Sequence, residues 1–232
     1  MNKKIESIIT NCENYSEIQA EYENSLKIYK GLDDEQSCVL LINTLDKVLA
    51  KKSLETYKHS IHMVNIADRF AKELNFTKEE TERLKLIARF HDLGKLIIKE
   101  EVLNKNGKLT QDEWADMMKH SEYSCDIIQN STTFGYLATE ILHHHERYDG
   151  KGYPCGLKGE EIPLLSRVIA LVDTYEVFIN GRVYKPAISN KEAIKEIKRC
   201  SGTQFDPKIA KAFIKAFKNE EKIDDNNDIE KE

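Results

Sequence analysis

Helix start signals dominate this sequence and leave little room for a β-sheet. An S/T-x-x-E capping box precedes a segment of helical apolar periodicity at Thr77, Thr110 and Ser189. Asp206 followed by Pro207 forms a further N-cap and first-turn pair. The chain has only 10 Gly and 4 Pro in 232 residues, so turns are too few for a series of short strands. The sequence therefore predicts an all-α fold.

Apolar periodicity also predicts where the helices lie. We expect them over residues 14–30, 34–51, 53–75, 78–95, 111–129, 133–145, 163–179, 190–200 and 207–217. The stretch 147–163 contains four of the 10 glycines, and a long glycine-rich loop in a compact domain is often functional. We predict three parts: a helical extension over 1–52, a domain over 53–217 and an acidic, disordered tail over 218–232.

Charge and cysteine usage exclude several classes of protein. The formal net charge is −5, and residues 218–232, with three Lys against seven acidic side chains, contribute −4 of it. No basic excess remains to favour duplex nucleic acid or an anionic membrane. Five scattered cysteines without a CxxC pair fit neither a disulfide framework nor a thiolate zinc site. With no apolar leader or spanning run, we expect a cytoplasmic protein.

The histidines are concentrated in one part of the chain. All seven lie between residues 59 and 145. On the predicted helices His59 shares an apolar face with Met63 and Ile66, and Glu55 lies one turn earlier, so both polar side chains are expected to point inward. The other histidines predicted on buried faces are His91, His120, His144 and His145. His62 and His143 are offset from these faces and are predicted not to be ligands.

One carboxylate completes the candidate site. Asp173 follows the apolar run Val168 to Val172, and a buried carboxylate needs a cation, a set of hydrogen bonds or a metal. A salt bridge to Arg167 or Lys95 is the alternative. Each histidine alone is more typical of a hydrogen-bonded core residue, but their joint occurrence favours a metal site. Imidazole and carboxylate without thiolate suit iron, manganese or zinc in a hydrolytic site.

Two motifs carry a family resemblance. They are His91-Asp-Leu-Gly-Lys95 and the longer, more specific His144-His-Glu-Arg-Tyr-Asp-Gly-Lys-Gly-Tyr-Pro154. With them the sequence resembles the HD-GYP family of metal-dependent phosphohydrolases from about residue 53 to 217. The resemblance implies an HD-domain helical bundle with a GYP loop. It also implies hydrolysis of cyclic di-GMP to linear pGpG and onward to GMP by a metal-activated hydroxide.

The same resemblance implies roles for individual residues. The implied metal ligands are Glu55, His59, His91, Asp92, His120, His144, His145 and Asp173. Asp92 and Lys95 are the implied catalytic residues. The implied substrate-binding residues are Lys95, Gly152, Tyr153, Arg182 and Lys185. Two or three divalent or mixed-valence ions are expected, with iron or manganese preferred. A trinuclear site is the preferred version because Glu55 and Thr56 fit the family's three-metal pattern.

Some positions depart from the family pattern, and other functions stay open. Ser124 stands where glycine is common, and Glu176 stands where aspartate is usual. The alternatives are a phosphohydrolase acting on another cyclic dinucleotide or nucleotide, and a non-catalytic cyclic di-GMP receptor that signals through residues 1–52. Cyclic di-GMP is the implied partner. Contact between the GYP loop and diguanylate cyclase domains, and a homodimer, are left open.

Overall fold

The described part of the chain is helical. The computed structural model describes residues 34–129, 131–182 and 186–218. Its α-helices are α3 (Asp34–Lys52), α4 (Leu54–Glu73), α5 (Lys78–Phe90), α6 (Glu100–Leu103), α7 (Gln111–Met118), α8 (His120–Gln129), α9 (Ala138–Leu142), α10 (Leu164–Asn180), α11 (Asn190–Cys200) and α12 (Pro207–Phe217). The 3-10 helices are η1 (Leu93–Leu96), η2 (Gly135–Leu137) and η3 (Gly159–Glu161). The all-α prediction is confirmed.

Local capping explains where several helices begin. The boxes at Thr77, Thr110 and Ser189 all form, each with the side chain accepting from the third helical N–H and the Glu side chain accepting in return. The Asp206 carboxylate accepts from the first free N–H groups of α12. Ser53 caps α4 in the same way. A side-chain acceptor satisfies donors that the helix itself leaves unpaired, so these starts could be predicted from sequence.

Three predicted helices end earlier or divide. The helix expected over 78–95 ends at Phe90, the one over 111–129 breaks at Lys119, and the one over 133–145 ends at Leu142. A histidine follows each end, and its Nδ1 contacts a carbonyl three or four residues earlier, as His91 does with Ala88 at 2.9 Å. An imidazole that takes a last-turn carbonyl stabilises a helix C-terminus. Apolar periodicity continues through these points and does not reveal the breaks.

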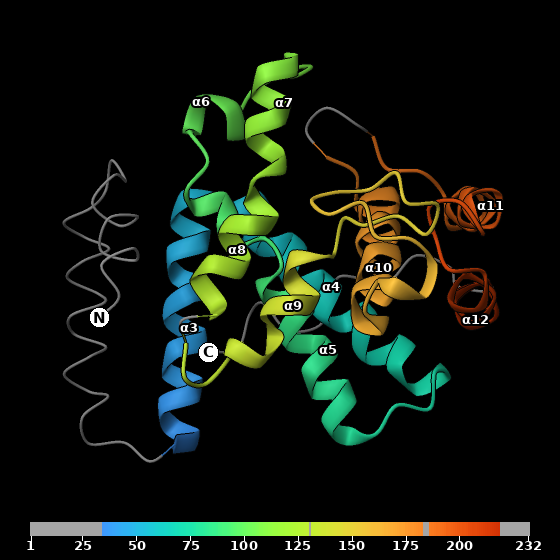
Figure 1. Cartoon of the computed structure of the whole chain (residues 1–232), viewed down its shortest axis with the longest axis horizontal. Coiled ribbons are helices and arrows are strands. Elements are labelled where there is room, and N and C mark those ends of the chain that lie inside the picture. The colour runs from blue at the N-terminus through green and yellow to red at the C-terminus, as the bar shows by residue number, and fades with distance from the viewer. Residues whose placement is uncertain (1–33, 130, 183–185, 219–232) are drawn as a thin grey trace.

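The helices enclose one apolar core (Figure 1). α4 and α5 pack against each other, with α3 on one side and α10, α11 and α12 on the other. Phe70 of α4, Tyr175 of α10 and the stacked pair Phe213 and Phe217 of α12 form its aromatic part. Leu49 of α3 belongs to the same core. Helix α3 therefore packs on the bundle, although it lies in the predicted extension.

Some predictions fall outside the described residues. They are the helix over 14–30, residues 219–232 of the tail and the substrate-binding role of Lys185. No helix in the described ranges combines the length and apolar character needed to cross a bilayer.

Candidate metal centre

Seven of the eight predicted ligands, all except Glu55, come from distant parts of the chain and meet between α4, α5, α8 and α10. His59 lies in the second turn of α4, and Asp173 lies in α10. Among the described residues, three groups have ligand atoms within 4.8 Å of one another: His120 with His144 and His145, His59 with His91 and Asp173, and His91 with Asp92 and His144. Shared members join these groups into one continuous cluster.

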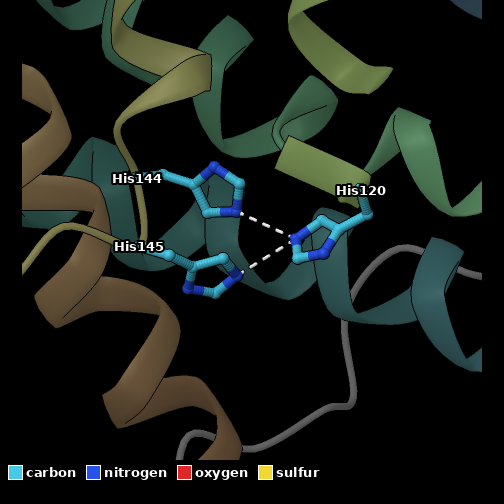
Figure 2. A group of neighbouring side chains, drawn as sticks. All are labelled: His120, His144 and His145. Carbon is cyan, nitrogen blue, oxygen red and sulfur yellow. Dashed lines mark hydrogen bonds between the residues drawn. The ribbon is translucent and has the colours of Figure 1, made fainter. Parts of the chain in front are cut away.

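Figure 2 shows the rings of His120, His144 and His145 directed toward one another. His120 Nε2 lies 3.3 Å from His144 Nε2 and 3.0 Å from His145 Nε2. The Nδ1 atoms of His120 and His144 lie 2.7 and 2.5 Å from the carbonyl oxygens of Met117 and Ile141. A carbonyl only accepts, so each Nδ1 carries a hydrogen and each Nε2 presents a lone pair. Facing lone pairs repel unless a cation lies between them, so this geometry fits a bound metal ion.

Burial keeps these three imidazoles neutral. It lowers the pKa of His120 to about 4, against the attraction of the Asp92 carboxylate. It lowers the pKa of His145 to about 3, and the nearby His120 adds to the effect. Burial and the neighbouring His145 hold the pKa of His144 well below its ordinary value. Neutral imidazole is the form that binds metal, so the triad is ready to bind at neutral pH.

Asp92 lies at the centre of the cluster. It is 2 % exposed, and its Oδ1 lies 3.3 Å from His120 Nε2. Its Oδ2 lies 3.3 Å from His91 Nε2 and 2.6 Å from Lys95 Nζ. Burial raises the pKa of Asp92, but the charges of His91 and Lys95 outweigh it and hold that pKa well below the ordinary range. The carboxylate is thus ionised, and its two oxygens face two different groups of imidazoles.

His59 lies between two carboxylates. Its Nε2 is 3.2 Å from Asp173 Oδ1, and its Nδ1 is 2.5 Å from Glu176 Oε2. Burial lowers the pKa of His59, but the hydrogen bonds with Asp173 and Glu176 raise it above its ordinary value overall. Because Glu176 accepts at Nδ1, Nε2 is the atom directed at the cluster. A carboxylate behind a histidine in this way orients the ring and increases its basicity as a ligand.

Glu176 is the functional residue that sequence reasoning missed. It is fully buried, and burial alone would raise its pKa, but hydrogen bonds from His59 and His62 lower that pKa to about 2. Its Oε1 lies 3.2 Å from His62 Nδ1 and accepts from the Asn180 side-chain amide at 2.9 Å. The available signal was its position three residues after Asp173 in the apolar helix α10, which puts both carboxylates on one face.

The expectation that Glu55 points inward beside His59 is wrong. The Glu55 side chain is 45 % exposed in the first turn of α4, and its Oε1 lies 3.7 Å from Arg182 Nε. Arg182 also lies 3.3 Å from the buried Glu176 carboxylate. The guanidinium therefore draws Glu55 toward the rim of the site. Asp173 was expected to be a buried carboxylate, but its side chain is 18 % exposed.

The alternative for Asp173, a salt bridge to Arg167 or Lys95, is not observed. Arg167 pairs with Asp206, 2.5 Å from Nη1 to Oδ2, and Lys95 pairs with Asp92. Neither cation contacts Asp173 in the structure. The nearest charged partner of the Asp173 carboxylate is His59, which supports a place in the cluster rather than in a structural ion pair.

Gly94 brings the segment after α5 against α8. A Cβ atom at this position would lie 2.0 Å from the His120 carbonyl oxygen and 2.5 Å from the Ser124 nitrogen. The Gly94 N–H donates to the Ser124 hydroxyl at 2.7 Å. The serine that replaces the family's usual glycine therefore gives a buried N–H its partner. This contact sets the distance between His91 and His120.

The loop after α9 forms a wall beside His145. The Tyr153 ring lies 4.8 Å from the His145 ring, and the backbone N–H of Tyr153 donates to the His145 carbonyl at 3.3 Å. A Cβ atom on Gly152 would lie 2.3 Å from the Arg147 nitrogen, so glycine is needed for the loop to fold back on itself. The predicted substrate-binding residues Lys95, Tyr153 and Arg182 thus surround the cluster, while Gly152 has an evident packing role.

Comparisons with known proteins agree with this geometry. The family model of the HD domain matches residues 43–209. A cyclic di-GMP phosphodiesterase of Thermotoga maritima is 32 % identical over 77 % of this chain and 49 % of its own length. A 3'3'-cGAMP-specific phosphodiesterase 2 of Vibrio cholerae is 32 % identical over 75 % of this chain and 34 % of its own length. The chain thus spans about half of these relatives or less.

A solved structure shares the fold. An HDG"Y"P protein from Bdellovibrio bacteriovorus superposes with a TM-score of 0.59 at 15 % identity, over 93 % of this chain and 77 % of that protein. HD domains bind divalent metal ions, and the histidine and aspartate cluster supplies suitable ligands. The two motifs, the helical bundle and the family match lead to one conclusion: this chain belongs to the HD domain family, on its HD-GYP branch.

Proposed function

We propose that this chain is a metal-dependent phosphodiesterase that hydrolyses cyclic di-GMP to linear pGpG and onward to GMP. The observation that carries the proposal is that imidazole lone pairs and the Asp92 carboxylate face a common space, which is an arrangement suited to binding cations. The relatives named as phosphodiesterases of cyclic dinucleotides support the choice of substrate class.

The proposed metal ligands remain those implied by the sequence. They are Glu55, His59, His91, Asp92, His120, His144, His145 and Asp173. Bound divalent ions supply a water of lowered pKa and Lewis-acid contacts to phosphoryl oxygens. Iron or manganese is the proposed metal, because the cluster offers imidazole and carboxylate and no thiolate.

The chain's own residues provide the remaining chemistry. Asp92 holds its charge at the centre of the cluster, where each oxygen faces a different imidazole. Lys95 lies 2.6 Å from Asp92 and is partly exposed, so its ammonium can turn toward a phosphate oxygen of the substrate. A fixed cation near the reacting phosphorus stabilises charge that develops on its oxygens.

Arg182 and Tyr153 are proposed to bind the rest of the substrate. The Arg182 guanidinium lies at the rim beside Glu55 and Glu176, and a guanidinium can bind phosphate through two parallel hydrogen bonds. Lys185 is proposed as a second phosphate contact. Tyr153 offers a flat apolar surface beside His145 for a base or ribose. Diguanylate cyclase domains and a second copy of the chain stay predicted partners.

The test measures bound metal and then the products formed from cyclic di-GMP. Metal-replete wild-type protein is expected to release pGpG and then GMP, while Asp92→Asn, which keeps the side-chain shape, is expected to lose hydrolysis. No hydrolysis by metal-replete wild type would refute the proposal. Binding of cyclic di-GMP without turnover would favour the receptor alternative.

A third metal is tested separately through Glu55. Glu55→Gln is expected to lower the metal content by one ion per chain and to leave pGpG as the accumulating product. Unchanged metal content in this variant would show that Glu55 serves only as a partner of Arg182. Asp68→Asn, a change of a partly exposed acid on the same helix, is the matched control.

A second substrate is favoured by a specific comparison. The similarity to a 3'3'-cGAMP-specific phosphodiesterase is as high, at 32 % identity, as that to the cyclic di-GMP enzyme of Thermotoga maritima. Both dinucleotides present the same pair of phosphodiesters and differ in one base. Measuring kcat/KM for both with one metal-replete preparation decides between them. A higher value for 3'3'-cGAMP would replace cyclic di-GMP as the proposed substrate.

A further inference from the structure

A second group of metal-ligand atoms lies beside the first but shares no residue with it. His143 follows α9, Glu146 begins the loop after His145, and Cys155 lies further along that loop. Their ligand atoms lie within 4.8 Å of one another. We infer that His143, Glu146 and Cys155 form a site for a zinc ion or a similar soft divalent cation. This inference does not rest on the proposed function.

Glu146 supplies the strongest observation. Its side chain is buried, with 3 % of the residue exposed, and its Oε1 accepts the Cys155 N–H at 2.7 Å. Its Oε2 is buried and has no hydrogen-bond partner among the described residues. A buried carboxylate oxygen without a hydrogen-bond partner destabilises the folded protein, because its desolvation is not compensated. A cation held between Glu146 and its two neighbours would satisfy that oxygen.

His143 and Cys155 are suited to hold this cation. His143 Nδ1 lies 2.8 Å from the Thr139 carbonyl oxygen, so Nδ1 carries the hydrogen and Nε2 presents its lone pair. Cys155 is a free, exposed cysteine. Its side chain can rotate toward the other two ligands, because solvent rather than packed protein surrounds it. The group thus offers one imidazole, one carboxylate and one thiolate.

This donor set favours zinc over the metals proposed for the main cluster. Zinc binds nitrogen, oxygen and sulfur at about 2.0–2.3 Å in a tetrahedron, which puts ligand atoms roughly 3.3–3.8 Å apart. Rotation of Cys155 can close the present spacing to that range. Three protein ligands leave a fourth position for water. The thiolate separates the two sites chemically, since the main cluster contains no sulfur.

A metal ion bound at this site would restrain the GYP loop, the segment that contains Gly152 and Tyr153. Glu146 directly follows His145, and Cys155 lies two residues after Tyr153, whose ring faces His145 at 4.8 Å. A metal bridging Glu146 and Cys155 would close the loop between these two residues at its base. We therefore infer a structural role: the ion holds the Tyr153 wall in place and reduces the loop's freedom to open.

Cobalt provides a direct test, because thiolate ligation of Co²⁺ gives a charge-transfer absorption band that nitrogen and oxygen ligands do not give. The full chain, freed of metal and titrated with Co²⁺, is expected to develop this band. Cys155→Ser is expected to abolish it, and Cys200→Ser, the matched control, is expected to retain it. Glu146→Gln keeps an acceptor for the Cys155 N–H and is expected to weaken cobalt binding about 10-fold or more.

Metal content and hydrolysis separate this site from the main cluster. Cys155→Ser is expected to contain one zinc ion fewer per chain while retaining the metals of the main cluster. A charge-transfer band that survives in Cys155→Ser, or its absence in the wild type, would overturn the inference. Absence of hydrolysis by the metal-replete wild type, together with a cobalt band that Cys155→Ser abolishes, would refute the proposed function and leave this site supported.

Discussion

Glu176 Oε2 lies 2.5 Å from His59 Nδ1, across 117 positions of sequence. The contact joins α4 to α10 and directs His59 Nε2 at Asp173 and the rest of the cluster. Three other histidines of the cluster use a backbone carbonyl for the same purpose, and His59 alone among these four uses a carboxylate. His59 is therefore expected to be the most basic imidazole ligand of the site.

Removal of the Glu176 charge should weaken metal binding at His59. Glu176→Gln keeps an acceptor for His59 but loses the charge, and we expect metal affinity to fall about 10–100-fold. Metal titration of the purified protein measures the effect. Asn180→Ala removes a different hydrogen bond to the same carboxylate and is expected to change affinity little. Equal affinities for Glu176→Gln and wild type would show that the carboxylate only fills space.

The close approach at Gly94 predicts a steric effect on the site. Gly94→Ala puts a methyl group against the His120 carbonyl, so η1 and α8 must separate. We expect a loss of roughly 1–3 kcal/mol in the free energy of unfolding and weaker metal binding. Urea denaturation and metal titration measure the two effects. Gly135→Ala, whose Cβ would lie 3.2 Å from its nearest neighbour, is the control and should be the milder change.

The buried imidazoles predict how the metal-free protein responds to acid. The pKa of His120 falls from its ordinary 6.5 to about 4 on folding, so between these values the unfolded chain binds the extra proton. The free energy of unfolding therefore has its full value above pH 6.5 and decreases as the pH falls toward 4. At about 1.4 kcal/mol per pKa unit, His120 contributes on the order of 3 kcal/mol.

Urea denaturation of the metal-free protein at a series of pH values measures that loss. Between pH 6.5 and pH 4, the free energy of unfolding of His120→Gln should depend less on pH than that of the wild type. The outcome that contradicts the assignment is a variant whose stability falls as steeply as that of the wild type.

Arg182 is expected to affect substrate binding more than turnover. Arg182→Lys keeps a charge beside Glu176 but loses the two-pronged geometry, and we expect KM for cyclic di-GMP to rise about 10-fold or more with a smaller change in kcat. Steady-state kinetics on the metal-replete protein gives both constants. Arg199→Lys, on the exposed face of α11, is the matched control. A fall in kcat at constant KM would assign Arg182 to the chemical step instead.

Local signals were sufficient for most of the fold. The caps at Thr77, Thr110 and Ser189 lie within three residues of their partners, so a short stretch of sequence contains all the information. The helix break at His91 was not predictable in this way. Apolar residues continue at helical spacing through Leu93 and Leu96, and the break depends on the imidazole taking the Ala88 carbonyl.

The site was less accessible to sequence reasoning wherever two distant segments meet. Periodicity put Glu55 on the face of His59, but Arg182, a residue of another segment, draws its carboxylate to the rim. The sequence marks Glu176 only as a departure from the family's usual aspartate. Its buried position and its hold on His59 depend on how α10 packs against α4, and no local pattern specifies that packing.

The long separation between His59 and its partners has a consequence for the newly made chain. When α4 leaves the ribosome, neither Asp173 nor Glu176 has been synthesised, so His59 has no carboxylate to orient it. Early capture of a metal by the first histidines would have to be reversible for the correct cluster to form. Stable metal acquisition is therefore expected only after translation has passed α10, and a chain truncated before Asp173 should be unable to retain the full metal complement.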